Sequence, residues 1–240
     1  MTCKGCGKTD KLIKAHIIPE SFFRGLRGEK KPIKIISNTP GIYPKRTPVG
    51  VYDENILCRE CEDKFQEIDN YGHKILIANE LQHEKLYQNR KLVGYKIHNV
   101  NQKLLKLFFI SILWRASIST HYFYSKVDLG KLENQAKELI WNMHTGGDDD
   151  FSFVLSRFDD DLAGRSILDP HKERWFGVNY YRFYLYGFTL YIKSDSQRTP
   201  KKWQQFMPID DSLIVISRGN IKRTKEYPLM VQTANMRQNA

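Results

Sequence analysis

Two short cysteine motifs, Cys3-Lys4-Gly5-Cys6 and Cys58-Arg59-Glu60-Cys61, decide how the first part of this chain folds. A two-residue spacer lets both thiolates of a pair contact one ion, and two pairs supply the four ligands of a closed tetrahedral zinc site. The motifs use all four cysteines of the chain. A redox-active pair, or four unrelated thiols, would not explain two equal spacings. We therefore expect the four cysteines to hold one structural Zn²⁺ ion.

The second cysteine pair also opens a predicted helix. Apolar residues recur at spacings of three and four from Leu57 through Phe65 to Tyr71, which places them on one face of a helix. Before Leu57, glycines and prolines interrupt short apolar pieces, so this part has little core of its own. A structural zinc ion supplies on the order of 10 kcal/mol of folding free energy, enough to hold such a part together. A turn at the first pair, strands between the pairs and a helix at the second pair are the arrangement of a treble clef.

Residues 101–118 are the most apolar segment in the rest of the chain. They are apolar on nearly all sides, which predicts a buried helix at the centre of a second domain. Residues 132–143 have an amphipathic pattern, with Asp128 as the predicted cap and Gly146-Gly147 as the predicted stop. The further predicted elements are a helix over 73–88 and strands over 151–155, 180–192 and 213–217.

The segment 175–191 contains nine aromatic residues. Such a segment can be a platform on which single-stranded bases stack. Strand propensity alone also explains it, because aromatic residues favour a sheet face that packs on helices. We favour the packed sheet.

Positive charge is concentrated at the two ends of the chain. The formal net charge is +11, with 11 Lys+Arg against 3 Asp+Glu in residues 1–50, 19 against 21 in residues 51–195, and 8 against 3 in residues 196–240. Localised positive charge favours a polyanionic partner, because each neutralised phosphate releases condensed counterions. A solvated basic face is the alternative.

Composition excludes two classes of protein. With 41% hydrophobic residues the chain can build a core, which excludes disorder as its main state. The longest apolar stretch, residues 104–114, is far shorter than the roughly 20 residues of a membrane-spanning helix. The N-terminus, Met1-Thr2-Cys3-Lys4, lacks an apolar signal segment, so we expect a cytoplasmic protein in a reducing compartment.

Three motifs taken together resemble a known family. They are Cys3-x-x-Cys6, then Lys14-Ala15-His16-Ile17-Ile18-Pro19-Glu20-Ser21, then Asn55-Ile56-Leu57-Cys58-x-x-Cys61-Glu62. This combination resembles the HNH endonuclease superfamily in its zinc-stapled version with the ββα-metal fold. The resemblance covers about residues 1–70, which is under a third of the chain.

The resemblance implies a site for phosphodiester hydrolysis. His16 matches the general base, a role that suits a neutral imidazole near pH 7. Glu62 stands where the family completes the site of a catalytic metal, and its carboxylate suits Mg²⁺ or Mn²⁺. Asn55 or Asp53 would organise the histidine loop. The sequence departs from the family at Ala15, where an acidic residue or histidine usually binds the metal.

The resemblance also implies DNA as the partner. Basic residues beside the motif would hold the phosphate backbone in register without reading sequence. The five that we single out are Lys14, Arg24, Arg27, Lys30 and Lys31. A role in bacterial or antiviral defence follows by analogy, with a homodimer or a partner protein of a defence system as further interactions. The alternative is a catalytically inactive treble clef that binds nucleic acid or a protein.

The sequence therefore predicts an α+β protein in two parts. Residues 1–72 form an N-terminal treble-clef, ββα-metal module with a four-cysteine zinc site, which carries the nuclease-like residues. Residues 73–240 form a mixed domain of helices and antiparallel strands, for which dimerisation or target recognition is the expected role.

Overall fold

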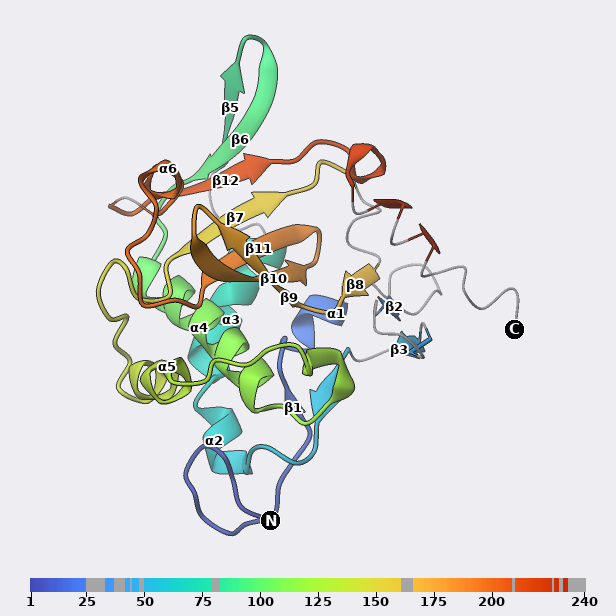
Figure 1. Cartoon of the computed structure of the whole chain (residues 1–240), viewed down its shortest axis with the longest axis vertical. Helices are drawn as coiled ribbons and strands as arrows, with labels where there is room; N and C mark the ends of the chain where they lie inside the picture. Colours follow the sequence, from blue (N-terminus) through green and yellow to red (C-terminus); the bar gives the residue numbers. More distant parts are fainter. Residues whose placement is uncertain are drawn as a thin grey trace.

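A seven-stranded sheet and the helices packed against it make up most of this α+β protein (Figure 1). The computed structural model describes residues 1–24, 33–36, 42–43, 45–47, 50–78, 83–160, 166–208, 210–225, 227–228 and 231–232. Within these residues there are six α-helices. No helix in the described part is long and apolar enough to cross a membrane. The α+β class predicted from the sequence is confirmed.

The large sheet has the strand order β5-β6-β12-β7-β11-β10-β9. Every neighbouring pair is antiparallel except β12 and β7, which are parallel. The strands are β5 (His83–Gln88), β6 (Lys91–Ile97), β7 (Phe153–Arg157), β9 (His171–Trp175), β10 (Val178–Leu185), β11 (Phe188–Lys193) and β12 (Leu213–Ser217).

Helix α4 (Gln102–Ile118) lies at the centre of the core, between the sheet and two further helices. Phe109 of α4 meets Phe153 of β7 with ring centroids 4.7 Å apart. Helix α3 (Gln66–His73) packs closely on α4, because a Cβ at Gly72 would lie 2.5 Å from the Phe108 ring. Helix α5 (Leu132–Trp141) packs on α4 through Trp141 and Trp114, whose ring centroids are 5.1 Å apart. The central buried helix predicted over 101–118 is confirmed.

Short elements build the N-terminal part. Strand β1 (Ala15–His16) pairs antiparallel with β4 (Tyr52–Asp53). Strands β2 (Ile33–Ile36) and β3 (Lys45–Thr47) form a second small sheet with β8 (Ser166–Leu168), which comes from far along the chain. The short helices are α1 (Ser21–Arg24), α2 (Arg59–Asp63) and α6 (Lys201–Gln204). Single turns of 3₁₀ helix occur at Tyr122–Tyr124 and Ile221–Arg223.

One hydrophobic core extends across the boundary drawn at residue 72. Its buried members run from Cys3 in the first motif to Val215 in β12. Helix α3 continues past residue 72 into a π-helical turn, Lys74–Ala78. The N-terminal part is therefore packed into the remainder of the protein, and β8 completes one of its sheets.

Two predicted helices differ from the structure. The helix expected over 73–88 is wrong in its second half, where His83–Gln88 is strand β5. These residues pair with β6 over their whole length, and this pairing overrides the helical spacing of their apolar residues. Asp128 does not cap α5, since Lys131 is the N-cap residue and the Asp128 carboxylate accepts the N–H of Gly130 at 2.8 Å.

The predicted strands are confirmed, with limits that differ from the prediction by up to two residues. The segment 180–192 is the hairpin of β10 and β11, with a turn at Tyr186 and Gly187. The strands expected over 151–155 and 213–217 are β7 and β12. The aromatic segment is mainly a packed sheet, because most of its rings are buried, whereas Trp175 at the end of β9 and Phe176 in the turn that follows are exposed.

Candidate functional site

The four cysteines come together as one cluster. The Sγ atoms of Cys3, Cys6, Cys58 and Cys61 all lie within 4.8 Å of one another, and none forms a disulfide. The Cys6 and Cys58 sulfurs are 3.9 Å apart. Tetrahedral zinc with bonds of about 2.3 Å separates its sulfurs by about 3.8 Å. The donor set and its spacing therefore fit the predicted Zn²⁺ ion.

Local backbone structure places the two pairs against each other. Cys58 N–H donates to Cys3 Sγ at 3.3 Å, and Lys4 N–H donates to the Ile56 carbonyl at 2.8 Å. Gly5 lies in the tight turn of the first pair. A residue with a Cβ does not fit there, because the Cβ would lie 2.7 Å from Cys61 Sγ. Three of the four cysteines are buried, and helix α2 starts directly after Cys58.

The thiols differ in acidity. Burial opposes ionisation of Cys3, but backbone N–H groups of Cys6 and Cys58 outweigh it and lower its pKa to about 7. Burial and the neighbouring sulfurs raise the pKa of Cys61. A cation at the centre of the cluster would offset the repulsion between thiolates, and zinc binding there would release protons.

The β1–β4 pair positions His16. Ala15 lies opposite Asp53 and His16 opposite Tyr52, so side chains alternate between an inner and an outer face. Ala15 is fully buried on the inner face. The His16 ring lies on the other face beside Tyr52, with ring centroids 5.8 Å apart, and its Nε2 atom is buried.

Glu62 meets β1 at His16. The backbone N–H of His16 donates to Glu62 Oε1 at 3.3 Å, so the carboxylate that follows the last cysteine lies at the histidine. Glu62 Oε2 is buried and has no hydrogen-bond partner among the described residues. Burial raises the pKa of Glu62, and nearby Asp69 adds to this against the opposing charge of Arg115. In the described part of the chain, the cysteine cluster is the only group of three or more potential metal ligands. Among these residues, Glu62 therefore belongs to no set of three ligands that could hold a catalytic metal without substrate or water.

Asp53 anchors a distant loop. Its carboxylate accepts hydrogen bonds from Ser119 Oγ at 2.9 Å and from the backbone N–H groups of Thr120 and His121 at 2.6 and 3.1 Å. Burial by itself would raise the pKa of Asp53. The hydrogen bonds stabilise the carboxylate more strongly, so the pKa is lowered. Asn55 is exposed, and its backbone N–H donates to Asp53 Oδ1 at 2.9 Å. Asp53 thus fixes β4 to the end of α4.

Arg115 was not among the predicted site residues, although it holds the histidine strand. Its side chain is 0% exposed and forms a bidentate ion pair with Asp69 at 2.9 and 2.7 Å. Arg115 Nη1 also donates to the backbone carbonyl of His16 at 2.9 Å. The guanidinium lies over the Phe65 ring at 4.5 Å. The sequence signal was an arginine near the end of the helix that the apolar pattern predicts to be buried.

The structure describes only some of the residues that the sequence predicts to contact DNA. Lys14 is exposed, lies 5.0 Å from the Tyr52 ring and pairs with Glu54 at 3.6 Å. Arg24 is described as the last residue of α1 by its backbone only. Arg27, Lys30 and Lys31 lie outside the described residues.

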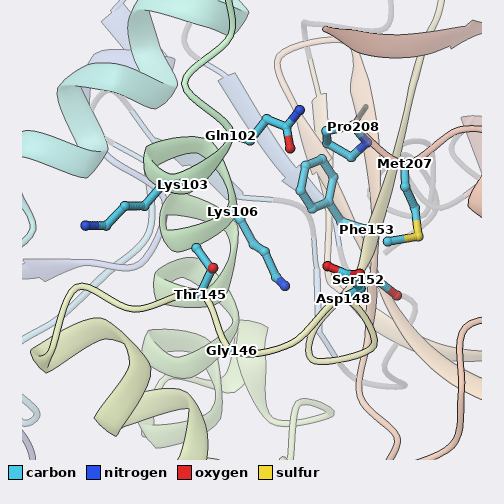
Figure 2. Close-up of a pocket in the computed structure, with 10 residues that line it drawn as sticks. All are labelled: Gln102, Lys103, Lys106, Thr145, Gly146, Asp148, Ser152, Phe153, Met207 and Pro208. Carbon is cyan, nitrogen blue, oxygen red and sulfur yellow. The ribbon is translucent and has the colours of Figure 1, made fainter. Parts of the chain in front are cut away.

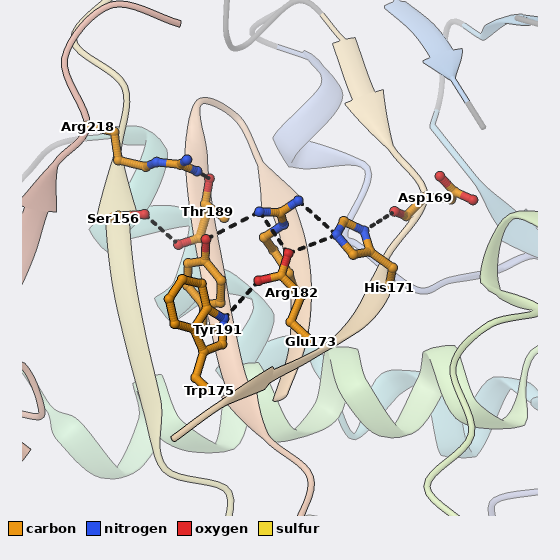
Figure 3. Close-up of polar contacts among 9 residues, drawn as sticks. All are labelled: Ser156, Asp169, His171, Glu173, Trp175, Arg182, Thr189, Tyr191 and Arg218. Carbon is orange, nitrogen blue, oxygen red and sulfur yellow. Dashed lines mark hydrogen bonds and ion pairs between the residues drawn. The ribbon is translucent and has the colours of Figure 1, made fainter. Parts of the chain in front are cut away.

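Two further polar regions lie away from these residues. A cavity of about 290 Å³ lies beside the start of α4, where Lys106 Nζ donates to the Gly147 carbonyl at 2.9 Å (Figure 2). On the sheet face opposite α4, Glu173 binds Arg182 at 2.9 Å, His171 at 3.1 Å and Trp175 Nε1 at 2.9 Å (Figure 3). These charged groups satisfy one another, so we interpret the second region as a structural network.

No protein-family model, curated protein or solved structure matches this chain. Function must therefore be argued from the residues themselves.

Proposed function

We propose that this protein is a metal-dependent endonuclease of the HNH type that cleaves or nicks DNA. The observation that carries the proposal is the hydrogen bond from the backbone N–H of His16 to Glu62 Oε1, which places the carboxylate beside the histidine. It joins the two residues that the family resemblance assigns to the general base and the metal ligand. The treble-clef description of the cysteine module belongs to the same proposal.

The cysteine cluster supports this arrangement mechanically. Helix α2 begins at the second cysteine pair, so a zinc ion at the cluster would fix the position of Glu62 one residue after Cys61. Arg115 fixes the other partner by holding the carbonyl of His16. The backbone on both sides of the contact is thus held by buried groups.

His16 would accept the proton of the attacking water. A neutral imidazole can do this near pH 7, and such a base contributes about 10²- to 10⁴-fold. Glu62 would hold Mg²⁺ or Mn²⁺, which supplies Lewis-acid stabilisation of the charge on the phosphate. Because Glu62 belongs to no set of three potential ligands among the described residues, substrate phosphates and water would complete the coordination.

Nicking of supercoiled plasmid with Mg²⁺ or Mn²⁺ tests the proposal. We expect H16A to lose about 10²-fold or more of the rate, E62Q to lose activity that added Mn²⁺ partly restores, and the exposed-site control H144A to keep full activity. Activity that survives H16A would contradict the general-base assignment.

The second candidate is a zinc module that binds nucleic acid or protein without cleaving. The observations that favour it are the fully buried Ala15, which offers no ligand, and Glu62, which belongs to no set of three potential ligands among the described residues. DNA binding by a wild-type protein that shows no cleavage with either metal would support this candidate.

A further inference from the structure

A β-ribbon projects from the large sheet, and we call its residues 85–93 the arm (Figure 1). Strand β12 pairs with β6 only from Gly94 to Ile97, so the strands of the arm pair mainly with each other. Beyond Gly94 and its partner Leu86, strand β6 extends by three residues and strand β5 by two, a length of about 7–10 Å at 3.3 Å per residue. The arm is therefore a two-stranded extension of the edge of the sheet.

Most of the arm's side chains face solvent. Tyr87 is 61% exposed and Val93 39% exposed. The basic residues Lys85, Arg90 and Lys91 are exposed as well. Isolated two-stranded ribbons are only marginally stable in water. Because the arm adds little to the core, folding alone gives no reason for a ribbon with this surface.

The tip of the arm carries an arginine in an unfavourable conformation. Asn89 and Arg90 form the turn with φ values of 50° and 62°. A two-residue hairpin turn of this kind favours glycine at its second position, because a residue with a Cβ is strained at a positive φ. A guanidinium thus occupies the tip where glycine would be unstrained.

The arm is a basic region inside a nearly neutral part of the chain. Residues 85–93 contain three basic residues and no acidic residue, whereas residues 51–195 as a whole have two more acidic than basic residues. Runs of aspartate elsewhere in residues 51–195 cancel the positive charge of the arm when the net charge of this part is summed. In the fold, the positive charge projects into solvent.

We propose that the arm enters the major groove of duplex DNA. This inference rests on the proposed function, because it takes DNA as the partner. Strands about 4.8 Å apart form a ribbon that fits a groove about 12 Å wide. Lys85 and Lys91 would contact the phosphates that line the groove, and Arg90 at the tip would reach the base edges.

Fluorescence anisotropy with a 30-base-pair duplex at several salt concentrations, without added Mg²⁺ or Mn²⁺, tests the arm. The variant R90G/K91S removes two positive charges from the arm, and the control K103S/K131S removes two from exposed lysines elsewhere. We expect the arm variant to bind about 10- to 30-fold more weakly near 0.15 M salt and its salt slope to fall by about 1, because Lys91 is the phosphate contact that it removes. The control should bind like the wild type.

The single variant R90G separates binding from folding. Glycine suits the φ of 62° at this position, so the melting temperature should stay equal or rise while DNA affinity falls. A parallel loss of stability and affinity would contradict the inference.

The remaining outcomes distinguish the two proposals. If wild-type protein binds the duplex and R90G/K91S binds it with the same affinity and salt slope, the arm inference is wrong and the nuclease proposal stands. If wild-type protein binds no duplex at any salt concentration, both are wrong. If R90G/K91S instead dissociates a dimer, measured by light scattering, with DNA affinity unchanged, the arm is a protein interface and the inference is overturned.

Discussion

The cysteine region, residues 1–63, and the sheet region, residues 83–217, are built in different ways. The helices of the cysteine region have four or five residues and its strands two to four. The sheet region contains a 17-residue helix and a strand of eight residues. Long elements bury enough apolar surface to support themselves, whereas short ones need other constraints. In the cysteine region these constraints are the sulfur cluster and the polar anchors to α4.

Loss of zinc binding at the cysteine cluster should give the largest difference in stability between the two regions. Cys58→Ser, or a strong zinc chelator, removes a contribution on the order of 10 kcal/mol that the sheet region does not use. We expect amide protection in residues 1–63 to disappear while the β10–β11 hairpin stays protected, as measured by hydrogen exchange. Equal loss in both regions, or less than one zinc per freshly purified chain, would contradict this.

Arg115 should give the next largest effect, because it joins the two regions. Arg115→Met leaves the buried carboxylate of Asp69 without its partner, at a cost of about 3–5 kcal/mol in urea unfolding. Removing both charges in R115M/D69L should restore part of this loss. The control K137M removes an exposed cation whose Nζ donates to the Lys4 carbonyl at 3.3 Å, and it should cost under about 1 kcal/mol. An R115M protein as stable as K137M would show that Arg115 does not hold the regions together.

Gly5 tests how tightly the cluster is built. Gly5→Ala places a methyl group 2.7 Å from Cys61 Sγ, so zinc affinity should fall by about 1–3 kcal/mol in competition with a chelating dye. Gly147→Ala is the matched control, since its Cβ would meet its nearest neighbour at an ordinary 3.5 Å. Unchanged affinity in G5A would indicate a looser turn at the first cysteine pair.

Substitution of Glu62 should give the smallest effect on stability. It should stabilise the protein at pH 7, whereas the substitutions above weaken folding or zinc binding. Burial raises the pKa of Glu62 above the ordinary value of 4.5, so the folded state holds the proton more tightly than the unfolded state. Its contribution to stability therefore falls as pH rises through 4.5 and the folded-state pKa. Thermal melts from pH 4 to 8 should show E62Q less sensitive to pH and more stable at pH 7, by under about 2 kcal/mol. The exposed-site variant E60Q should follow the wild type, and an E62Q protein that is less stable than wild type at pH 7 would contradict the sign.

Local patterns predicted the elements that bury themselves. The apolar run around α4, the amphipathic pattern of α5 and the β-branched and aromatic segments of β7, β10, β11 and β12 each specify their structure through their own residues. Strand β5 could not be predicted in this way, because its apolar residues fit a helix and only pairing with β6 makes it a strand. The same holds for Asp128, whose place relative to α5 depends on where the preceding turn ends.

The sequence by itself determined which residues could bind zinc and which histidine and carboxylate were candidates, because motif spacing and side-chain chemistry are local properties. Only the tertiary structure decided that Glu62 meets His16, that Asp53 anchors the end of α4, that Arg115 holds the histidine strand and that the arm projects from the sheet. Each of these relations joins groups brought together by packing of the whole chain, and no local pattern encodes which distant groups will meet.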